Sequence, residues 1–277
     1  LVVEETYILC MGHDAKSAAR AGYFLEDLMN LNEGPFVEKQ DTTREYLYSP
    51  RMVHSGYALD QFPVEYIKQM AHAGITSILL YVNDVNKTPH GEFDFNELIE
   101  RADDHGIDVY AYSRIWNRMY PEGEEAEKYY DNLYGRLFRS CPGLKGIVFV
   151  GESFEFPSKD EHSSGIIRIE NRDENGNPIV RKPNPGFWPC YDYPLMIDMV
   201  KKSIRAVRPD ADIVFWTYNW GYVEEKYRLD LLNNIPTDVS LLVTFEMFED
   251  IPVQDVTTRV HDYSLYFGGP GKYFLSE

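Results

Sequence analysis

Two glutamates directly follow short apolar runs that are typical of buried strands. Glu152 follows Ile147–Val150 and Gly151, and Glu246 follows Ser240–Phe245. Runs this short and this apolar predict strands that are covered on both faces, as in a parallel sheet. A carboxyl group at the end of such a strand is held rigidly and can exchange a proton with a ligand. We therefore expect Glu152 and Glu246 to be the two catalytic carboxyl residues, although Glu152 could instead cap the start of a loop.

Hydrogen-bonding groups and aromatic rings lie within or beside nearly all the other predicted strand ends. Together with the two glutamates they would surround one opening with carboxylates, amides and indoles. This set suits a polyhydroxylated ligand and the chemistry of a glycoside hydrolase. One carboxylic acid protonates the leaving oxygen, and a second carboxylate meets the oxocarbenium-like carbon. The expected substrate-binding residues are Arg51, His54, Asn83, Asp84, Arg114, Trp216, Tyr218 and Asn219.

Two assignments remain open at this point. Other acids could supply the second carboxylate in place of Glu246. Arg114 could bind a substrate carboxylate in the bidentate geometry that arginine prefers, or it could pair with Glu152 or another nearby acid. The competing acids are Asp84, Glu155, Glu249 and Asp250.

The elements that would position these residues alternate between strand and helix from Arg51 onward. Such alternation predicts an α/β fold with a parallel sheet, here a (β/α)8 TIM barrel whose last unit is missing at the C-terminus. In that fold the carboxyl ends of the strands form the active-site face. The rival fold is an open doubly wound sheet, which usually has a glycine-rich phosphate loop after its first strand. Segment 54–60, at the end of the first predicted strand, is not a loop of this kind. The expected strands are Met52–Gly56, Thr76–Val82, Asp108–Tyr112, Gly146–Val150, Asp212–Tyr218, Ser240–Phe245 and Tyr263–Phe267; the expected helices are Pro63–Ala73, Phe95–His105, Gly123–Ser140, Tyr193–Val207 and Glu224–Asn233.

Residues 1–50 have a different pattern. A strand at Thr6–Met11 and a helix at Ala15–Leu31, with Asp14 as its N-cap, precede a connector that ends at Pro50. One strand and one helix cannot bury a core alone. We therefore expect 1–50 to be the C-terminal part of a small α/β domain plus connector, and 51–277 to be the barrel. Further domains of the same longer chain are expected partners.

A long insertion separates the fourth predicted strand from its helix. Within Ser153–Asp192, two alternating runs flank Asn175-Gly176, the strongest short signal for a β-hairpin. An insertion after the carboxyl end of a strand lies over the opening of a barrel, where it either lines a cleft or stays exposed to solvent.

Composition narrows the possible partners. The 277-residue chain has a formal net charge of −18, which argues against nucleic acid and anionic membranes because both require clustered Lys and Arg. No apolar stretch has the length of a membrane span. The 3 cysteines are widely spaced, and no histidine lies at ligand spacing from His54, so we predict no metal and no cofactor. Localisation does not follow from these features.

The first barrel unit carries a family resemblance. The spacing Arg51, Asp60, Pro63, Glu65, Ile67-Lys68 and Met70-Ala71, followed by Asn83-Asp84, resembles the opening of the barrel in family 20 β-N-acetylhexosaminidases. The piece from Asp14 to the Pro50-Arg51 entry to the barrel is similar to the end of the small domain that precedes the barrel there and in family 67 α-glucuronidases.

The resemblance implies roles for particular residues. An arginine at the Arg51 position binds sugar hydroxyls, and Glu152 matches the glutamate that acts as the acid after strand 4. Gly151 stands where the hexosaminidases have an aspartate that orients the substrate's acetamido group. An arrangement similar to family 67, with Glu152 as acid and Glu246 as the carboxylate from a later strand, therefore fits better.

The expected function is hydrolysis of a hexosaminide- or glucuronide-type bond in an oligosaccharide or glycoside. The alternative is a non-catalytic carbohydrate-binding or structural barrel module of a larger enzyme.

Overall fold

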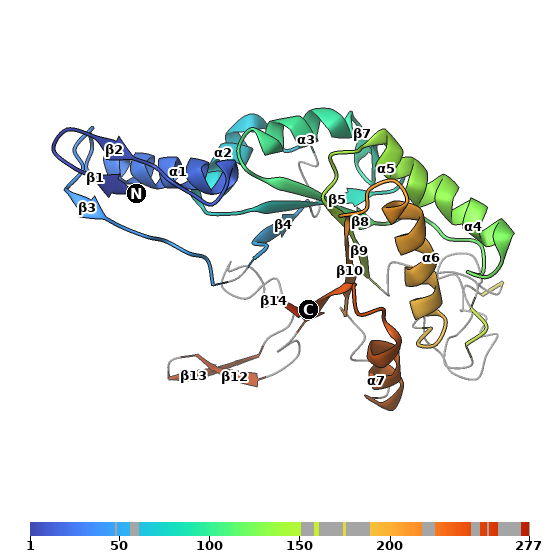
Figure 1. The fold of residues 1–277 in the computed structure, drawn as a ribbon. Helices are drawn as coiled ribbons and strands as arrows, with labels where there is room; N and C mark the ends of the chain where they lie inside the picture. The colour runs from blue at the N-terminus through green and yellow to red at the C-terminus, as the bar shows by residue number, and fades with distance from the viewer. Residues whose placement is uncertain are drawn as a thin grey trace.

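The centre of the protein is a curled sheet whose parallel strands follow one another in sequence order. In the computed structural model, strands β4 to β11 of this sheet are neighbours in the order of the chain, which is the order of a TIM-type barrel and not of a doubly wound sheet. They form a curled half-barrel (Figure 1). The parallel strands are β4 (Met52–His54), β5 (Ser77–Val82), β8 (Asp108–Ser113), β9 (Gly146–Val150), β10 (Asp212–Trp216) and β11 (Ser240–Thr244).

Placement is described for most of the chain. The described residues are 1–47, 49–55, 61–150, 158–160, 174–175, 189–217, 225–244, 250–253, 255–259 and 273–276.

The last strand of the sheet differs from the expected barrel pattern. Strand β14 (Tyr273–Ser276) pairs with β11, but it runs antiparallel to it. The parallel strand expected at Tyr263–Phe267 and the hairpin expected around Asn175-Gly176 lie largely or wholly outside the described residues.

Helices cover the convex side of the sheet (Figure 1). Each fills the connection between consecutive parallel strands, as a parallel sheet requires. Within the described residues, no helix combines the length and the apolar character needed to cross a membrane. The helices of this layer are α2 (Val64–His72), α3 (Phe95–Asp103), α4 (Glu124–Tyr130), η1 (Asp131–Gly135), α5 (Arg136–Ser140), α6 (Tyr193–Arg205) and α7 (Glu225–Asn234).

One predicted helix contains a local irregularity. The expected helix Gly123–Ser140 begins with Gly123 as N-cap and ends at Ser140, but its centre, η1, has one turn of π-helix. A π-turn inserts an extra residue into the helix, which rotates the side chains that follow it. Here Tyr130 and Tyr134 stack with centroids 6.3 Å apart.

The strand residues divide between two apolar layers because side chains alternate across a sheet. On the convex side, residues such as Leu80 and Phe149 are fully buried against the helices. The Phe149 ring lies 5.6 Å from the Tyr134 ring, and burying such a ring contributes about 1.5–3 kcal/mol. On the concave side, a second cluster contains Leu79, Val148 and Val214. This division fixes which strand residues can reach a ligand in the opening.

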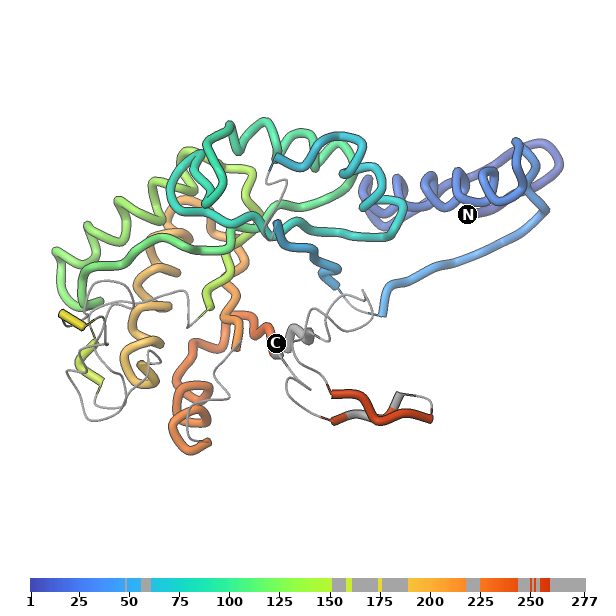
Figure 2. Tube along the Cα trace, turned by 180° about the vertical axis from the view of Figure 1, so that it is seen from behind, coloured from blue at the N-terminus to red at the C-terminus, as the bar shows by residue number. Residues whose placement is uncertain are grey.

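The first segment packs beside the first barrel helix. Strands β1 (Val2–Val3), β2 (Ile8–Leu9) and β3 (Gln40–Asp41) form an antiparallel sheet, and helix α1 (Ala15–Leu31) lies against α2. The predicted N-cap is confirmed, since the Asp14 carboxylate accepts a hydrogen bond from the Ser17 amide at 2.7 Å. Figure 2 shows this segment extending to one side of the barrel.

Short hairpins complete the described structure. Strands β6 (Lys87–Thr88) and β7 (Gly91–Glu92) form one hairpin after β5, and β12 (Asp250–Val253) pairs with β13 (Val256–Arg259) in another.

Candidate functional site

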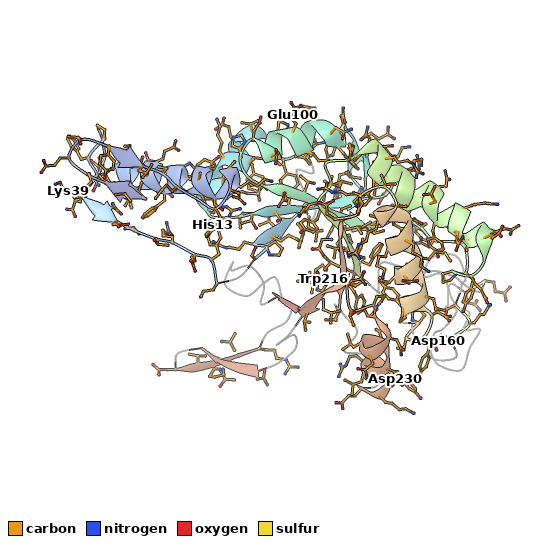
Figure 3. The ribbon with its side chains drawn as sticks, viewed as in Figure 1. His13, Lys39, Glu100, Asp160, Trp216 and Asp230 are labelled. Carbon is orange, nitrogen blue, oxygen red and sulfur yellow. The ribbon has the colours of Figure 1, made fainter. Side chains whose placement is uncertain are left out.

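A row of aromatic side chains crosses the concave face near the carboxyl ends of the strands. Alternation along each strand directs Tyr81 of β5, Tyr112 of β8 and Trp216 of β10 to this face, where they join the concave apolar cluster. His54, at the end of β4, continues the row. Figure 3 shows Trp216 at the end of β10. The strand ends therefore bring together two of the predicted site residues, His54 and Trp216.

Successive rings in the row are in contact. The His54 and Tyr81 rings stack with centroids 5.8 Å apart, and Tyr81 and Tyr112 are 4.5 Å apart. The Trp216 ring meets Tyr112 edge-on at 6.1 Å. Exposure falls along the row, from exposed His54 and half-buried Tyr81 to Tyr112 and Trp216 at 5% and 3%. Only the end of the row formed by His54 and Tyr81 is open enough to present a ring face to a sugar, while Tyr112 and Trp216 support it from below.

Backbone contacts fix the start of this row. The Tyr81 amide donates to the Ser55 hydroxyl at 3.2 Å, and the Ser55 amide donates to the Leu79 carbonyl at 3.0 Å. These bonds hold the end of β4 against β5 beyond the last ladder pair, and Ser55 is buried there. The position of His54 beside Tyr81 is therefore set by the sheet itself.

Tyrosines of the helix after β8 hold the loop that follows this strand. The Tyr134 hydroxyl donates to Asn117 Oδ1 at 3.1 Å and lies 3.2 Å from the Ser113 hydroxyl. Tyr134, Ser113 and Asn117 are all buried. Because the single phenolic proton is directed to Asn117, Ser113 is the donor to Tyr134. Burial raises the pKa of Tyr134 well above its usual value, so the hydroxyl stays protonated.

The same loop is held at further points. The Tyr129 hydroxyl accepts from the Arg118 amide at 2.9 Å, and the Tyr130 hydroxyl donates to the Met119 carbonyl at 2.8 Å. Asn117 Nδ2 donates to the Ile115 carbonyl at 2.8 Å. Segment 113–119 is thus a fixed platform at the carboxyl edge of the sheet.

Arg114 projects from this platform. Its Cζ lies 5.6 Å from the centroid of the Tyr81 ring, and its side chain is exposed. By alternation it continues the concave series Tyr110 and Tyr112. Trp116, two residues further, is 44% exposed.

Arg51 lies at the other end of the sheet from this row. It precedes β4, and its carbonyl accepts hydrogen bonds from the Thr76 and Ser77 amides, just at the start of β5. Its guanidinium lies 4.9 Å from the Tyr46 ring and close to Gly74. The expectation that Arg51 lines the opening with the other residues is therefore corrected, because the residue stands before its strand and not after it.

Asp84 follows β5 but is directed to the convex side. Its carboxylate contacts the Arg136 guanidinium of α5 and also accepts from the Val85 amide at 2.7 Å. Asn83 is two residues after Tyr81 and so follows the concave face. It is exposed, and its amide donates to the Lys87 carbonyl at 2.9 Å. Asp84 is therefore a poor candidate for the second carboxylate, whereas Asn83 remains near the edge of the row.

The predicted catalytic pair lies outside the described residues. The strands that lead to Glu152 and Glu246, β9 and β11, end at Val150 and Thr244. Tyr218 and Asn219, which follow β10, also lie outside the described residues.

A polar contact closes the amino end of the concave face. Tyr110 crosses Gly146 and donates to the Asp212 carboxylate at 3.2 Å, and the Ser240 hydroxyl donates to the same carboxylate at 2.8 Å. Burial, and then the Asp212 charge, raise the pKa of Tyr110 well above its usual value, so it remains a donor. A β-carbon at Gly146 would lie 2.3 Å from the Asp212 carbonyl oxygen. Glycine is therefore required at this crossing.

A buried carboxylate joins the two ends of the insertion after β9. Asp192 accepts from the Ser158 hydroxyl at 2.6 Å and from the Lys159 and Asp160 amides at 2.6 and 2.9 Å. In return, Asp160 accepts from the Tyr191 amide at 2.7 Å. Asp160 and Asp192 are both buried, and Figure 3 shows Asp160 near the start of α6. We call this set of residues the insertion clamp.

In the part of the chain that the structure describes, no cluster of His, Cys, Asp or Glu has the composition of a metal site.

Sequence reasoning missed three tyrosines of the site. The sequence pattern assigns Tyr81 and Tyr112 only to strands, and Tyr134 only to a helix. The signal for the first two is the alternation in Ser77–Val82 and Asp108–Ser113, which gives them the parity opposite to the aliphatic residues that face the helices. The π-turn that directs Tyr134 has no comparable signal.

Comparison with known proteins gives similarity of overall architecture only. No protein-family model and no curated protein sequence matches the chain. A glycoside hydrolase family 20 β-N-acetylglucosaminidase structure is 10% identical over 90% of this chain and 64% of that chain, with a TM-score of 0.48. The CpGH84B structure is 11% identical over 71% of this chain and 33% of that chain, with a TM-score of 0.46.

A third similar structure has a different activity. A sugar phosphate isomerase/epimerase from Parabacteroides distasonis is 14% identical over 72% of this chain and 66% of that chain, with a TM-score of 0.39. This chain therefore spans from about a third to about two thirds of these proteins. A shared activity does not follow at this level of similarity.

Proposed function

We propose that this chain is the barrel of a glycoside hydrolase that cleaves a hexosaminide- or glucuronide-type bond. The observation that carries the proposal is the aromatic row formed by His54, Tyr81, Tyr112 and Trp216. Its rings come from β4, β5, β8 and β10, on the concave face near the carboxyl ends of these strands, and β9 lies between the last two. A sugar ring that lies on this row would be at the carboxyl edge of the sheet, the edge at which β9 and β11 also end.

The alternation of side chains along β9 and β11 supports the assignment of Glu152 and Glu246 as the catalytic residues. Val148 and Val150 of β9 belong to the concave cluster, and Leu242 of β11 packs against it. Counting on by twos along the sequence, Glu152 has the parity of Val150, and Glu246 has the parity of Leu242. We assign Glu152 as the general acid and Glu246 as the carboxylate that meets the anomeric carbon, as nucleophile or through a water.

The test is turnover of paired glycosides by the full-length protein. Glu152→Gln keeps the shape and removes the transferable proton, which typically costs on the order of 10²–10⁴-fold in rate, or about 3–5 kcal/mol. The loss should shrink for aryl glycosides, whose leaving groups need no proton. Glu246→Gln should slow all substrates alike. Glu124→Gln, on the exposed first turn of α4, is the matched control.

Two outcomes would oppose the proposal. Near-normal turnover of an unactivated glycoside by Glu152→Gln would exclude that residue as the acid. Binding of oligosaccharides without any cleavage would favour the alternative, a carbohydrate-binding module. One observation suits that alternative: among the described residues, the row carries rings and a guanidinium, while Asp84 is directed away from it.

A further inference from the structure

The environment of Arg114 differs from that of the arginines that pair with carboxylates, because its guanidinium, like that of Arg51, lies over an aromatic ring. The chain has 45 acidic and 27 basic residues, so a basic side chain readily finds a carboxylate. Arg136, Arg139, Arg205 and Arg208 all pair with aspartates. Within the described ranges, no carboxylate lies at ion-pair distance from Arg114, and its guanidinium lies over the face of the Tyr81 ring.

The ring contact orients the guanidinium without neutralising it. A cation over an aromatic face gains about 0.5–1 kcal/mol at an exposed site, much less than it gains from a bound anion. Its N–H groups therefore remain able to donate to a carboxylate or sulfate in the bidentate manner. The ring that holds Arg114 is Tyr81, the second member of the aromatic row.

The backbone below Arg114 is held in place before any ligand binds. Its amide donates to the Val82 carbonyl at 2.9 Å, and the neighbouring Ser113 is fixed by the buried hydroxyl of Tyr134. Because the backbone is already fixed, only the Arg114 side chain has to be ordered on binding, and more of the interaction free energy contributes to affinity.

We propose that Arg114 selects substrates in which the sugar on the row carries an anionic substituent, a carboxylate or a sulfate. The inference rests on the proposed function, since it places the sugar on the same row. It also gives the concave face a specificity that the rings alone lack, because stacking on Tyr81 does not distinguish acidic from neutral sugars.

Binding to the full-length protein tests the proposal without requiring turnover. Sodium D-glucuronate, D-glucose 6-sulfate and D-glucose would be titrated by calorimetry against wild type and Arg114→Gln. A charge-assisted contact predicts that an anionic sugar binds wild type about 10- to 100-fold more tightly than glucose. Arg114→Gln should abolish this preference, and Arg114→Lys should retain part of it. Tight binding of glucuronate alone would identify a carboxylate, and tight binding of glucose 6-sulfate alone a sulfate.

The control removes the same charge elsewhere. Arg139→Gln, on the convex helix α5 where Arg139 pairs with Asp131, should leave the preference unchanged. Equal affinity of wild type for all three sugars, or an unchanged preference in Arg114→Gln, would overturn the inference. Pairing of Arg114 with Glu152 would also overturn it. In that case Glu152→Gln would bind the anionic sugars more tightly than wild type does, and Arg114→Gln would bind them as well as wild type does.

The two proposals fail in different ways. Absence of turnover with every glycoside, beside Arg114-dependent binding of an acidic sugar, would remove the hydrolase and keep the anion site. Cleavage of neutral glycosides at a rate that Arg114→Gln does not change would keep the hydrolase and remove the anion site.

Discussion

Replacing Tyr134 with Phe should destabilise the protein because the lost hydroxyl serves two buried partners. Tyr134 donates to Asn117 and accepts from Ser113, and all three side chains are buried. A typical hydrogen bond contributes about 0.5–1.5 kcal/mol, so the loss should be about 1–3 kcal/mol. For a chain of this size that is a fall in Tm of roughly 2–6 °C.

Thermal unfolding followed by circular dichroism measures this effect. Tyr129→Phe is the matched control, since it removes a hydroxyl from the same helix whose hydrogen bonds to the loop are exposed. Water can replace those bonds, so the control should change stability by less than about 0.5 kcal/mol. The double variant Ser113→Ala with Tyr134→Phe should lose less than the sum of the single changes, because it removes both partners of one bond.

An equal fall in Tm for Tyr134→Phe and Tyr129→Phe would refute this reasoning. Strict additivity in the double variant would do the same for the Ser113 contact.

Two further predictions concern a glycine of the sheet and the three cysteines. Gly146→Ala places a β-carbon against the Asp212 carbonyl oxygen, at 2.3 Å before relaxation. It should lower the free energy of unfolding by about 1–3 kcal/mol in urea titrations, and an unchanged midpoint would contradict the close approach. Burial raises the pKa of Cys141 to about 11 and that of Cys190 to about 12. At pH 8 a thiol reagent should therefore modify only Cys10 in the native protein, and all 3 cysteines in denaturant. Mass spectrometry counts the modified cysteines. Rapid labelling of Cys190 in the native protein would contradict the prediction, because it would show that this thiol is accessible.

Most of the sheet could be predicted because its strands are short apolar runs with clear boundaries. Strand Gly146–Val150 and helix Ala15–Leu31 have the predicted limits. Local sequence determines these limits, through the glycines around the strand and the Asp14 cap of the helix. The order of the parallel strands followed from the strand–helix alternation.

The site was less predictable because it depends on the direction of side chains. Arg51 and Arg114 are both arginines at strand boundaries, but one precedes its strand and the other follows it, so they lie at opposite ends of the sheet. Asp84 lies just after the end of its strand, yet its side chain is directed to the convex side, toward Arg136. Such distinctions require the register of each strand, because a shift of one residue moves every side chain of the strand to the other face of the sheet.

The insertion clamp has a consequence for how this protein can vary between related chains. The carboxylates of Asp160 and Asp192 hold residues 158–160 against residues 191–192, on either side of segment 161–188. Once its ends are joined, a loop loses only about 0.6 kcal/mol more when its length doubles. Residues could therefore be added or removed between the clamp positions at little cost in stability. Segment 161–188 is accordingly the place where we expect natural length variation and where a foreign peptide could be grafted.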